Sequence, residues 1–183
     1  GDTPSFRAAG EILRRLNCPL YFTPGNHDTE YDGAREQAGA LLNVPGPPFY
    51  RTITHQGWRL LFIDTSYWIH MDGSVDEYVD RSQLKDIYIP DSQIDWVRRQ
   101  LQDDPHTPTI CFTHTMLTLR DAYPGGTLPH DGTKVDRISL KLLGRSICQN
   151  PRLKAVLTEY DCIKAVFSGH GHRHAEERAI DLL

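Results

Sequence analysis

The sequence predicts a single α/β domain. Short apolar runs with the composition of buried strands alternate with segments in which apolar residues recur at helical spacing. Polar side chains follow three of these runs directly, as in α/β sheets that bind ligands beyond the carboxyl ends of their strands. The 183 residues are enough for one such domain with a sizeable core and do not demand two.

The composition excludes several kinds of partner. A net charge of -4 and a hydrophobic fraction of 39% are ordinary for a globular protein. They give no basic surface for nucleic acid as an obligate partner. The sequence holds no apolar run near the roughly 18 residues that a membrane span requires. It leaves the oligomeric state open and assigns no compartment, although the cytoplasm is slightly favoured.

The four cysteines show no C-x-x-C spacing, which argues against a structural zinc site. They are Cys18, Cys111, Cys148 and Cys162. We expect buried free thiols, with a disulfide pair as the alternative.

The first residues predict a helix and a short strand. A helix over 4–17 follows from Thr3 as cap, Pro4 in the first helical position and apolar residues at helical spacing. Residues 20–23 form a β-prone run that stops at a Pro-Gly pair.

A second helix and a hairpin follow. The helix is expected over 32–43, with Asp32 as its cap. Two β-prone runs, 49–53 and 58–63, flank a short glycine-containing turn, which is typical of a β-hairpin. Asp64 closes the second arm, and we expect it to bond loop amides near a functional site.

Two long segments, 65–90 and 115–134, show no clear period and are expected to be loops that line a site or cover it. Between them, Asp91 is expected to cap an amphipathic helix, and residues 109–113 read as a strand.

The last third predicts two helices and a strand. The helices are expected over 136–148 and 151–160, the second with Asn150 as cap and a proline in its first position. The strand is expected over 162–168.

Candidate metal ligands stand at three predicted strand ends. Asn26 and His27 follow the first strand, His114 ends another, and His170 and His172 follow the last. Each motif alone has a structural explanation, since asparagine is common in turns and histidine can cap a strand. Clustering favours a shared site, because imidazole and amide ligands suit zinc, manganese or iron. Paired metal ions are a recurrent device for phosphoryl chemistry.

The motifs Gly25-Asn26-His27-Asp28, His114 and Gly169-His170-Gly171-His172 resemble the later motifs of the calcineurin-like metallophosphoesterases. The loop arrangement is most similar to the branch of cyclic-nucleotide phosphodiesterases and purple-acid-phosphatase-like enzymes. The resemblance implies a four-layer α/β/β/α sandwich around two divalent or trivalent metal ions, manganese, iron or zinc. It also implies hydrolysis of phosphate mono- or diesters by a metal-bridging hydroxide, with a phosphorylated small molecule or a phosphodiester as substrate.

The resemblance assigns roles by position. Asn26, His114 and His170 would bind one ion, and His172 would bind the other. A further pair, His27 and Asp28, would be catalytic, with His27 assisting the leaving group and Asp28 orienting its ring.

Aromatic and histidine side chains on the two long segments are candidates for substrate contact, from their position alone. They are Trp68, His70, Tyr78, Tyr123 and His130.

The chain departs from the family pattern near its start. No D-x-H motif precedes Gly25, and Gly1-Asp2 matches the beginning of a G-D-x-x-D motif whose later Asp is replaced by Ser5. We therefore expect a domain truncated at the N-terminus, and at the C-terminus too, whose remaining residues hold at most one metal ion well. The alternative is a degenerate, non-catalytic member of the fold that binds a partner protein.

Overall fold

A computed structural model describes residues 3–77, 84–115 and 150–170 of the chain. Its elements in chain order are α1 (Thr3–Leu13), the 3₁₀ helix η1 (Asn26–Thr29), α2 (Ala34–Leu42), β1 (Arg51–His55), β2 (Trp58–Phe62), β3 (Tyr67–His70), β4 (Val75–Asp76), β5 (Leu84–Tyr88), α3 (Asp91–Asp103), β6 (Thr109–Thr113), α6 (Pro151–Thr158) and β7 (Ile163–Ser168). No helix in this described part is long and apolar enough to cross a bilayer. The helix expected over 136–148, most of the loop over 115–134 and Cys148 lie outside the described residues.

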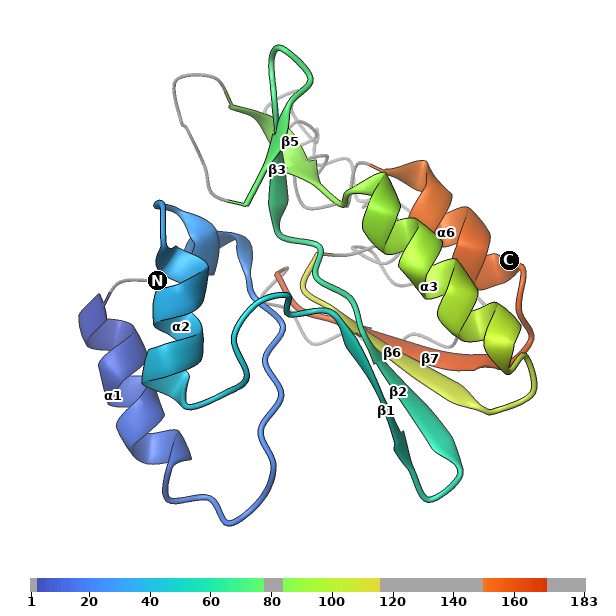
Figure 1. The fold of residues 1–183 in the computed structure, drawn as a ribbon, viewed down its shortest axis with the longest axis horizontal. Coiled ribbons are helices and arrows are strands. Elements are labelled where there is room, and N and C mark those ends of the chain that lie inside the picture. Colours follow the sequence, from blue (N-terminus) through green and yellow to red (C-terminus); the bar gives the residue numbers. More distant parts are fainter. Residues whose placement is uncertain (1–2, 78–83, 116–149, 171–183) are drawn as a thin grey trace, which may run out of the picture.

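A four-stranded sheet with the order β1-β2-β6-β7 carries the main core (Figure 1). β1 and β2 pair antiparallel around a turn at Gln56 and Gly57, whose φ angles of 48° and 78° suit a two-residue hairpin. β2, β6 and β7 run parallel, so their carboxyl ends lie along one edge. The predicted hairpin is confirmed, as are the strands over 109–113 and 162–168, the latter beginning one residue later.

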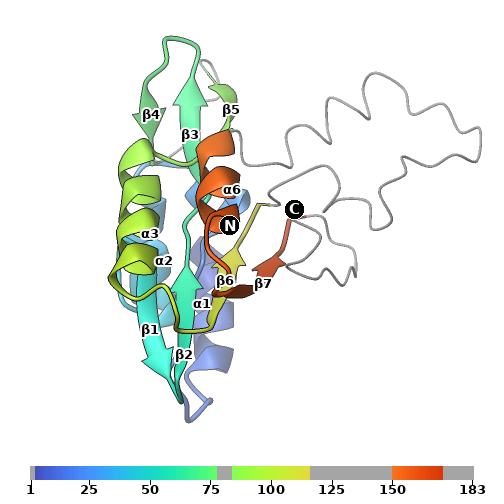
Figure 2. The ribbon, with the colours of Figure 1, turned by 90° about the vertical axis from the view of Figure 1, so that its right-hand side faces the viewer.

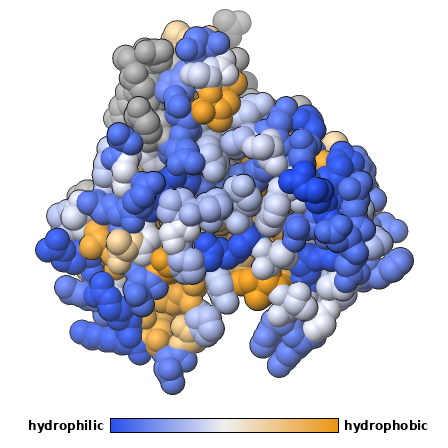
Figure 3. Space-filling view, viewed as in Figure 1, coloured by the Kyte–Doolittle hydropathy of each residue, from blue (hydrophilic) through white to orange (hydrophobic). Residues whose placement is uncertain are grey.

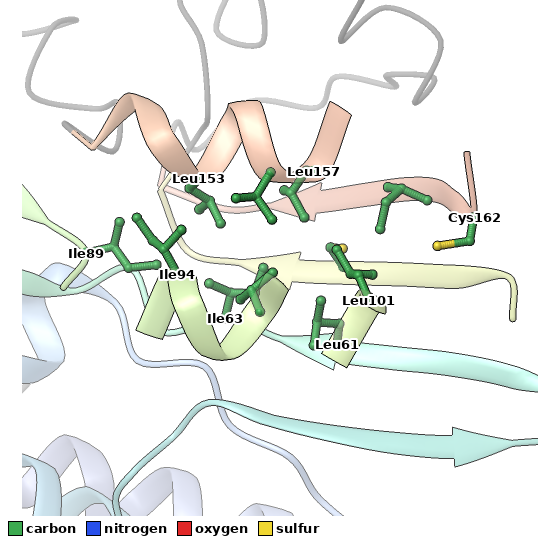
Figure 4. Packing of buried hydrophobic residues seen from close by; sticks show 12 residues of the cluster. Leu61, Ile63, Ile89, Ile94, Leu101, Leu153, Leu157 and Cys162 are labelled. Carbon is green, nitrogen blue, oxygen red and sulfur yellow. The ribbon is translucent and has the colours of Figure 1, made fainter. Parts of the chain in front are cut away.

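α3 and α6 lie side by side over one face of this sheet (Figures 1 and 4). Leu61 from β2 points into the layer between sheet and helices, where Ile94 and Leu101 of α3 meet Leu153 of α6. Cys111 from β6 belongs to the same buried cluster. All five side chains are fully buried. The apolar stripe that the sequence predicts on α3 therefore forms the centre of the core.

The other face of the sheet carries an aromatic stack. The rings of Phe62 and Phe112 stack with centroids 4.9 Å apart, and Phe112 and Phe167 follow at 5.6 Å. Tyr21 adds a tilted contact to Phe62 at 5.4 Å. Because side chains alternate along a strand, one face of each strand takes the aliphatic core and the other takes these rings.

α1 and α2 pack against each other on the far side of the strands from α3 and α6 (Figure 1). Phe6 of α1 is buried against Ala38 and Leu42 of α2. The helices approach so closely that a Cβ on Gly10 would lie 1.8 Å from the Leu41 carbonyl oxygen, so only glycine fits there. Figure 3 shows that this view of the surface is largely hydrophilic, with hydrophobic patches near the lower ends of the two helices.

The segment 65–90, expected to be an irregular loop, contains a second sheet with the order β4-β3-β5. It lies beyond the carboxyl end of β2 (Figure 2). The expectation is wrong because β3 is buried at Tyr67, Trp68 and His70, so its sequence lacks the alternation that marks a half-buried strand. Trp68 and His70 therefore lie on a buried strand and not on a loop.

Two predicted elements near the N-terminus are also wrong. α1 ends at Leu13 and not at 17, since hydrogen bonds from Arg15 to Ile12 and from Leu16 to Leu13 tighten the chain into separate turns. Residues 20–23 form no strand, although Phe22 packs edge-on against Phe49 at 5.1 Å. Phe22 also packs against the α1–α2 core, while the backbone of residues 20–23 joins neither described sheet.

Two predicted caps are corrected and one is confirmed. Gly33, in a left-handed conformation with φ 77°, precedes α2 in place of Asp32. Asp91 is the first residue of α3 after Pro90, and its carboxylate accepts a hydrogen bond from Asn150 at 2.7 Å. Asn150 caps α6 as predicted, accepting from Arg152 N at 3.1 Å.

The described cysteines are free thiols. Cys111 and Cys162 are buried, as expected, whereas Cys18 is exposed. Burial raises the pKa of the Cys111 thiol well above its ordinary value, which makes it a poor nucleophile.

Candidate metal centre

Three polar atoms from distant parts of the chain meet at the carboxyl edge of the parallel strands. The oxygen Oδ1 of Asn26 lies 3.0 Å from His114 Nε2 and 2.9 Å from His170 Nδ1. The two ring nitrogens lie 3.0 Å apart, with the rings edge to face. All three side chains are half-buried. The structure thus brings together three of the four predicted metal ligands, and His172 lies outside the described residues.

Hydrogen bonds alone satisfy this triangle poorly. Asn26 Oδ1 only accepts, and each ring nitrogen carries either one hydrogen or one lone pair. If both His114 Nε2 and His170 Nδ1 carry hydrogens, two donors face each other. If either lacks its hydrogen, that nitrogen directs a lone pair at Oδ1. A cation bound by all three lone pairs removes the conflict, so the donor set fits a metal ion.

The separations also fit the size of a metal site. Donor atoms about 2.1 Å from a metal ion lie about 3.0 Å apart when their bonds meet at right angles, and about 3.4 Å apart at tetrahedral corners. The observed 2.9 to 3.0 Å matches neighbouring positions of an octahedron. In the described part of the chain no three His, Cys, Asp or Glu side chains gather, so the site depends on the amide of Asn26.

The backbone around His114 leaves room for its ring. A Cβ on Gly25 would lie 2.9 Å from His114 Cε1, closer than side chains tolerate. Gly169 N donates to the His114 carbonyl oxygen at 3.0 Å, which ties the end of β7 to the end of β6. His170 then adopts a φ of 63°, a left-handed conformation that is uncommon for histidine and typical of constrained functional positions.

The 3₁₀ helix η1 gives the Asn26 motif two separate faces. Side chains three residues apart eclipse in a 3₁₀ helix, so Asn26 aligns with Thr29 and His27 aligns with Glu30. We call the first pair the ligand face and the second the exposed face. Thr29 is fully buried, and its hydroxyl accepts a hydrogen bond from Trp68 Nε1 at 3.0 Å. The ligand face is thereby anchored to β3.

The exposed face holds the predicted proton donor. The side chain of His27 is 74% exposed, and its Nδ1 lies 2.8 Å from Glu30 Oε1. We expected Asp28 to orient this ring, and the carboxylate that the structure places against Nδ1 is that of Glu30. Asp28 Oδ2 instead accepts from Gly25 N at 2.9 Å and completes a capping box.

A buried polar network supports the site from behind. Arg35 and Asp64 form a fully buried ion pair, and Arg35 also donates to the Ser66 carbonyl at 2.8 Å. Ser66 Oγ donates to the Pro24 carbonyl at 2.7 Å, next to Gly25. Burial raises the pKa of Asp64, and the charge of Arg35 opposes that shift. As expected, Asp64 bonds a loop amide, accepting from Ser66 N at 3.0 Å.

The same network reaches the His114 loop and α3. Thr115 N donates to Thr65 Oγ1 at 3.0 Å, in the turn that links β2 to β3. Gln93 exchanges two hydrogen bonds with the backbone of Asp64, at 2.8 and 2.9 Å. The loops that carry two of the three predicted metal ligands are therefore fixed to one buried segment, residues 64–66.

Sequence reasoning missed Arg35, Ser66 and Glu30. One signal for Arg35 existed, because it occupies the same helical stripe as Ala38 and Leu42, where an arginine needs a buried partner. The structure places the substrate candidates Trp68 and His70 in buried positions, with His70 Nε2 3.0 Å from Asp76 Oδ2. Tyr78, Tyr123 and His130 lie outside the described residues.

Comparisons with known proteins show the family to which the chain belongs. The glycerophosphodiester phosphodiesterase GpdQ of Enterobacter lignolyticus (strain SCF1) is 27% identical over 176 residues. The match covers 94% of this chain and 51% of that relative, so the chain spans about half its length. The calcineurin-like phosphoesterase family matches residues 2–174, nearly the whole sequence. The chain therefore belongs to the calcineurin-like phosphoesterase family.

Proposed function

We propose that the complete protein hydrolyses phosphate esters, with phosphodiesters as its preferred class of substrate. The observation that carries the proposal is the triangle of Asn26 Oδ1, His114 Nε2 and His170 Nδ1, whose 2.9 to 3.0 Å edges match the spacing of ligands around a cation. Family membership supports hydrolysis. The preference for diesters rests on the glycerophosphodiester phosphodiesterase relative, and the same relative favours an enzyme over a non-catalytic binding module.

The residues present fit a metal centre. Asn26, His114 and His170 would hold one ion of manganese, iron or zinc, and His172 would contribute to a second. When bound, such ions supply positive charge to the phosphate oxygens and make a water molecule more acidic. The four-layer α/β/β/α sandwich of the complete domain is part of this proposal, and the helix pairs on either side of the strands support it (Figure 1).

His27 would act on the leaving group. As a water oxygen bonds to phosphorus and releases a proton to solvent, the bond between phosphorus and the leaving oxygen breaks, and protonated His27 donates its proton to that oxygen. Its 74% exposure leaves the ring accessible to a substrate. Asp28 would keep the turn in shape through its bond to Gly25 N. Trp68 and His70 are buried, so neither would contact the substrate directly. Trp68 would support the site through its hydrogen bond to Thr29, and His70 through its place in the sheet β4-β3-β5.

The test uses the complete protein loaded with manganese, a panel of nitrophenyl phosphate mono- and diesters, and an alkyl diester such as diethyl phosphate. We expect hydrolysis of the diesters, and a loss of roughly 100-fold or more in kcat for alkyl diesters in His27→Ala, the usual range for general acids. The absence of hydrolysis by metal-loaded protein, or undiminished activity in His27→Ala, would contradict the mechanism. A protein that binds no metal and hydrolyses no ester would instead fit the non-catalytic binding module.

A further inference from the structure

Among the described residues, one carboxylate lies against the ring of His27, and it comes from outside the recognised motif. Nδ1 of His27 lies 2.8 Å from Glu30 Oε1, a normal hydrogen-bond length. The side chain of His27 is 74% exposed, so packing does little to fix its orientation. Glu30 is only 28% exposed. The more buried carboxylate of Glu30 therefore constrains the exposed ring of His27.

The fold places Glu30 by a specific route. The 3₁₀ spacing of η1 aligns positions 27 and 30, and Glu30 still has near-helical angles, φ -84° and ψ -2°, as the final residue of that turn. The preceding residue, Thr29, is fully buried and bonded to Trp68. The anchored neighbour Thr29 and the three-residue period of η1 together hold the Glu30 carboxylate next to Nδ1 of the ring.

We propose that Glu30 is a positioning residue for His27. Its carboxylate accepts the Nδ1 hydrogen, which fixes the ring orientation and the tautomer and reserves Nε2 for proton exchange with the leaving oxygen. Asp28 is engaged elsewhere, accepting from Gly25 N at 2.9 Å. The catalytic part of this inference rests on the proposed hydrolysis, whereas the effect of Glu30 on the ring itself does not.

The kinetic test compares two diesters whose leaving groups need different amounts of protonation. Ethyl 4-nitrophenyl phosphate releases a stable nitrophenolate, while diethyl phosphate must release ethoxide and needs a proton. In the complete, metal-loaded protein, Glu30→Ala is expected to lower kcat about tenfold on diethyl phosphate and less than about twofold on the nitrophenyl ester, with KM unchanged.

Two further variants make the comparison specific. Glu30→Gln keeps an oxygen that accepts the Nδ1 hydrogen, so its kcat should stay within about threefold of the wild type. Glu36→Ala is the matched control, because it removes the same charge from an exposed position on α2. An equal loss on both esters would overturn the proposal, as would a further loss when Glu30→Ala is added to His27→Ala.

A spectroscopic measurement separates this inference from the proposed function. Nitrogen NMR of metal-free protein, at a pH where imidazole is neutral, should show His27 protonated at Nδ1 in the wild type and in Glu36→Ala. In Glu30→Ala the population should shift toward the Nε2-protonated form. An unchanged tautomer overturns the positioning role even if the protein is a hydrolase. A shifted tautomer in a protein without hydrolase activity would refute the proposed function alone.

Discussion

The two faces of η1 are held in different ways. On the ligand face, Thr29 is buried and bonded to Trp68, and Asn26 meets two histidines from the ends of β6 and β7. On the exposed face, His27 is 74% exposed and lies against a single described carboxylate, that of Glu30. One short turn thus joins a well-anchored side, which carries a predicted metal ligand, to an exposed side, which carries the predicted proton donor. Substitutions on the ligand face should lower stability or metal affinity, and substitutions on the exposed face should lower only the rate of catalysis.

The largest effect is expected behind the ligand face, at the buried ion pair of Arg35 and Asp64. Arg35→Met leaves the Asp64 carboxylate buried without its charge partner and should lower the free energy of unfolding by about 3–5 kcal/mol. Urea denaturation measures the loss. Arg98→Met is the matched control, because its partner Glu159 is 45% exposed and solvent screens such surface pairs, so that stability should change little. Equal losses in the two variants would refute the anchoring role of Arg35.

Removal of a ligand comes next. Asn26→Ala takes away the only oxygen of the described triangle. Loss of a residue that only supports a metal ligand costs up to about 100-fold in metal affinity or activity, so loss of the ligand itself should lower both by more than that. Titration calorimetry with manganese and diester assays would measure the two losses. For the chain as given we expect one bound ion, and two ions per chain would contradict that. Asn17→Ala, at an exposed position, should change neither quantity.

The space for the His114 ring offers a finer test. In Gly25→Ala the added methyl would lie 2.9 Å from His114 Cε1, which should displace the ring and lower activity about tenfold, as for loss of a supporting group. Gly46→Ala is the control, since a Cβ there meets nothing within 4 Å. If both variants keep full activity, His114 does not need its observed position. A crystal structure of Gly25→Ala would show directly whether the ring has moved.

The ligand triangle was predictable from the sequence because each member lies in a local motif. His114 and His170 follow strands β6 and β7, and parallel pairing alone brings their carboxyl ends together. Asn26 needs no strand before it, and residues 20–23 form none. The polar motif identified its position although the predicted element was wrong. Chemistry at the ends of elements was therefore easier to predict than the elements themselves.

The supporting network was not predictable in this way. Arg35 contacts Asp64 across 29 residues, and Ser66 contacts Pro24 across 42. No local sequence pattern indicates such pairs, since each depends on how β2 continues into β3. Glu30 was overlooked for a different reason, because its pairing with His27 depends on a three-residue period in η1 that four residues are too few to display.

The smallest expected effect separates the two faces of η1 most directly. Thr29→Val keeps the shape of the side chain but leaves the buried Trp68 Nε1 without an acceptor, so the free energy of unfolding should fall by about 1 kcal/mol. Activity on nitrophenyl and alkyl diesters should decline equally, if at all, because the exposed face keeps its pair. Glu30→Ala should do the reverse, leaving stability unchanged and slowing only the ester with the poor leaving group. If Thr29→Val instead reproduces that selectivity for the leaving group, the two faces are coupled and η1 moves as one rigid unit.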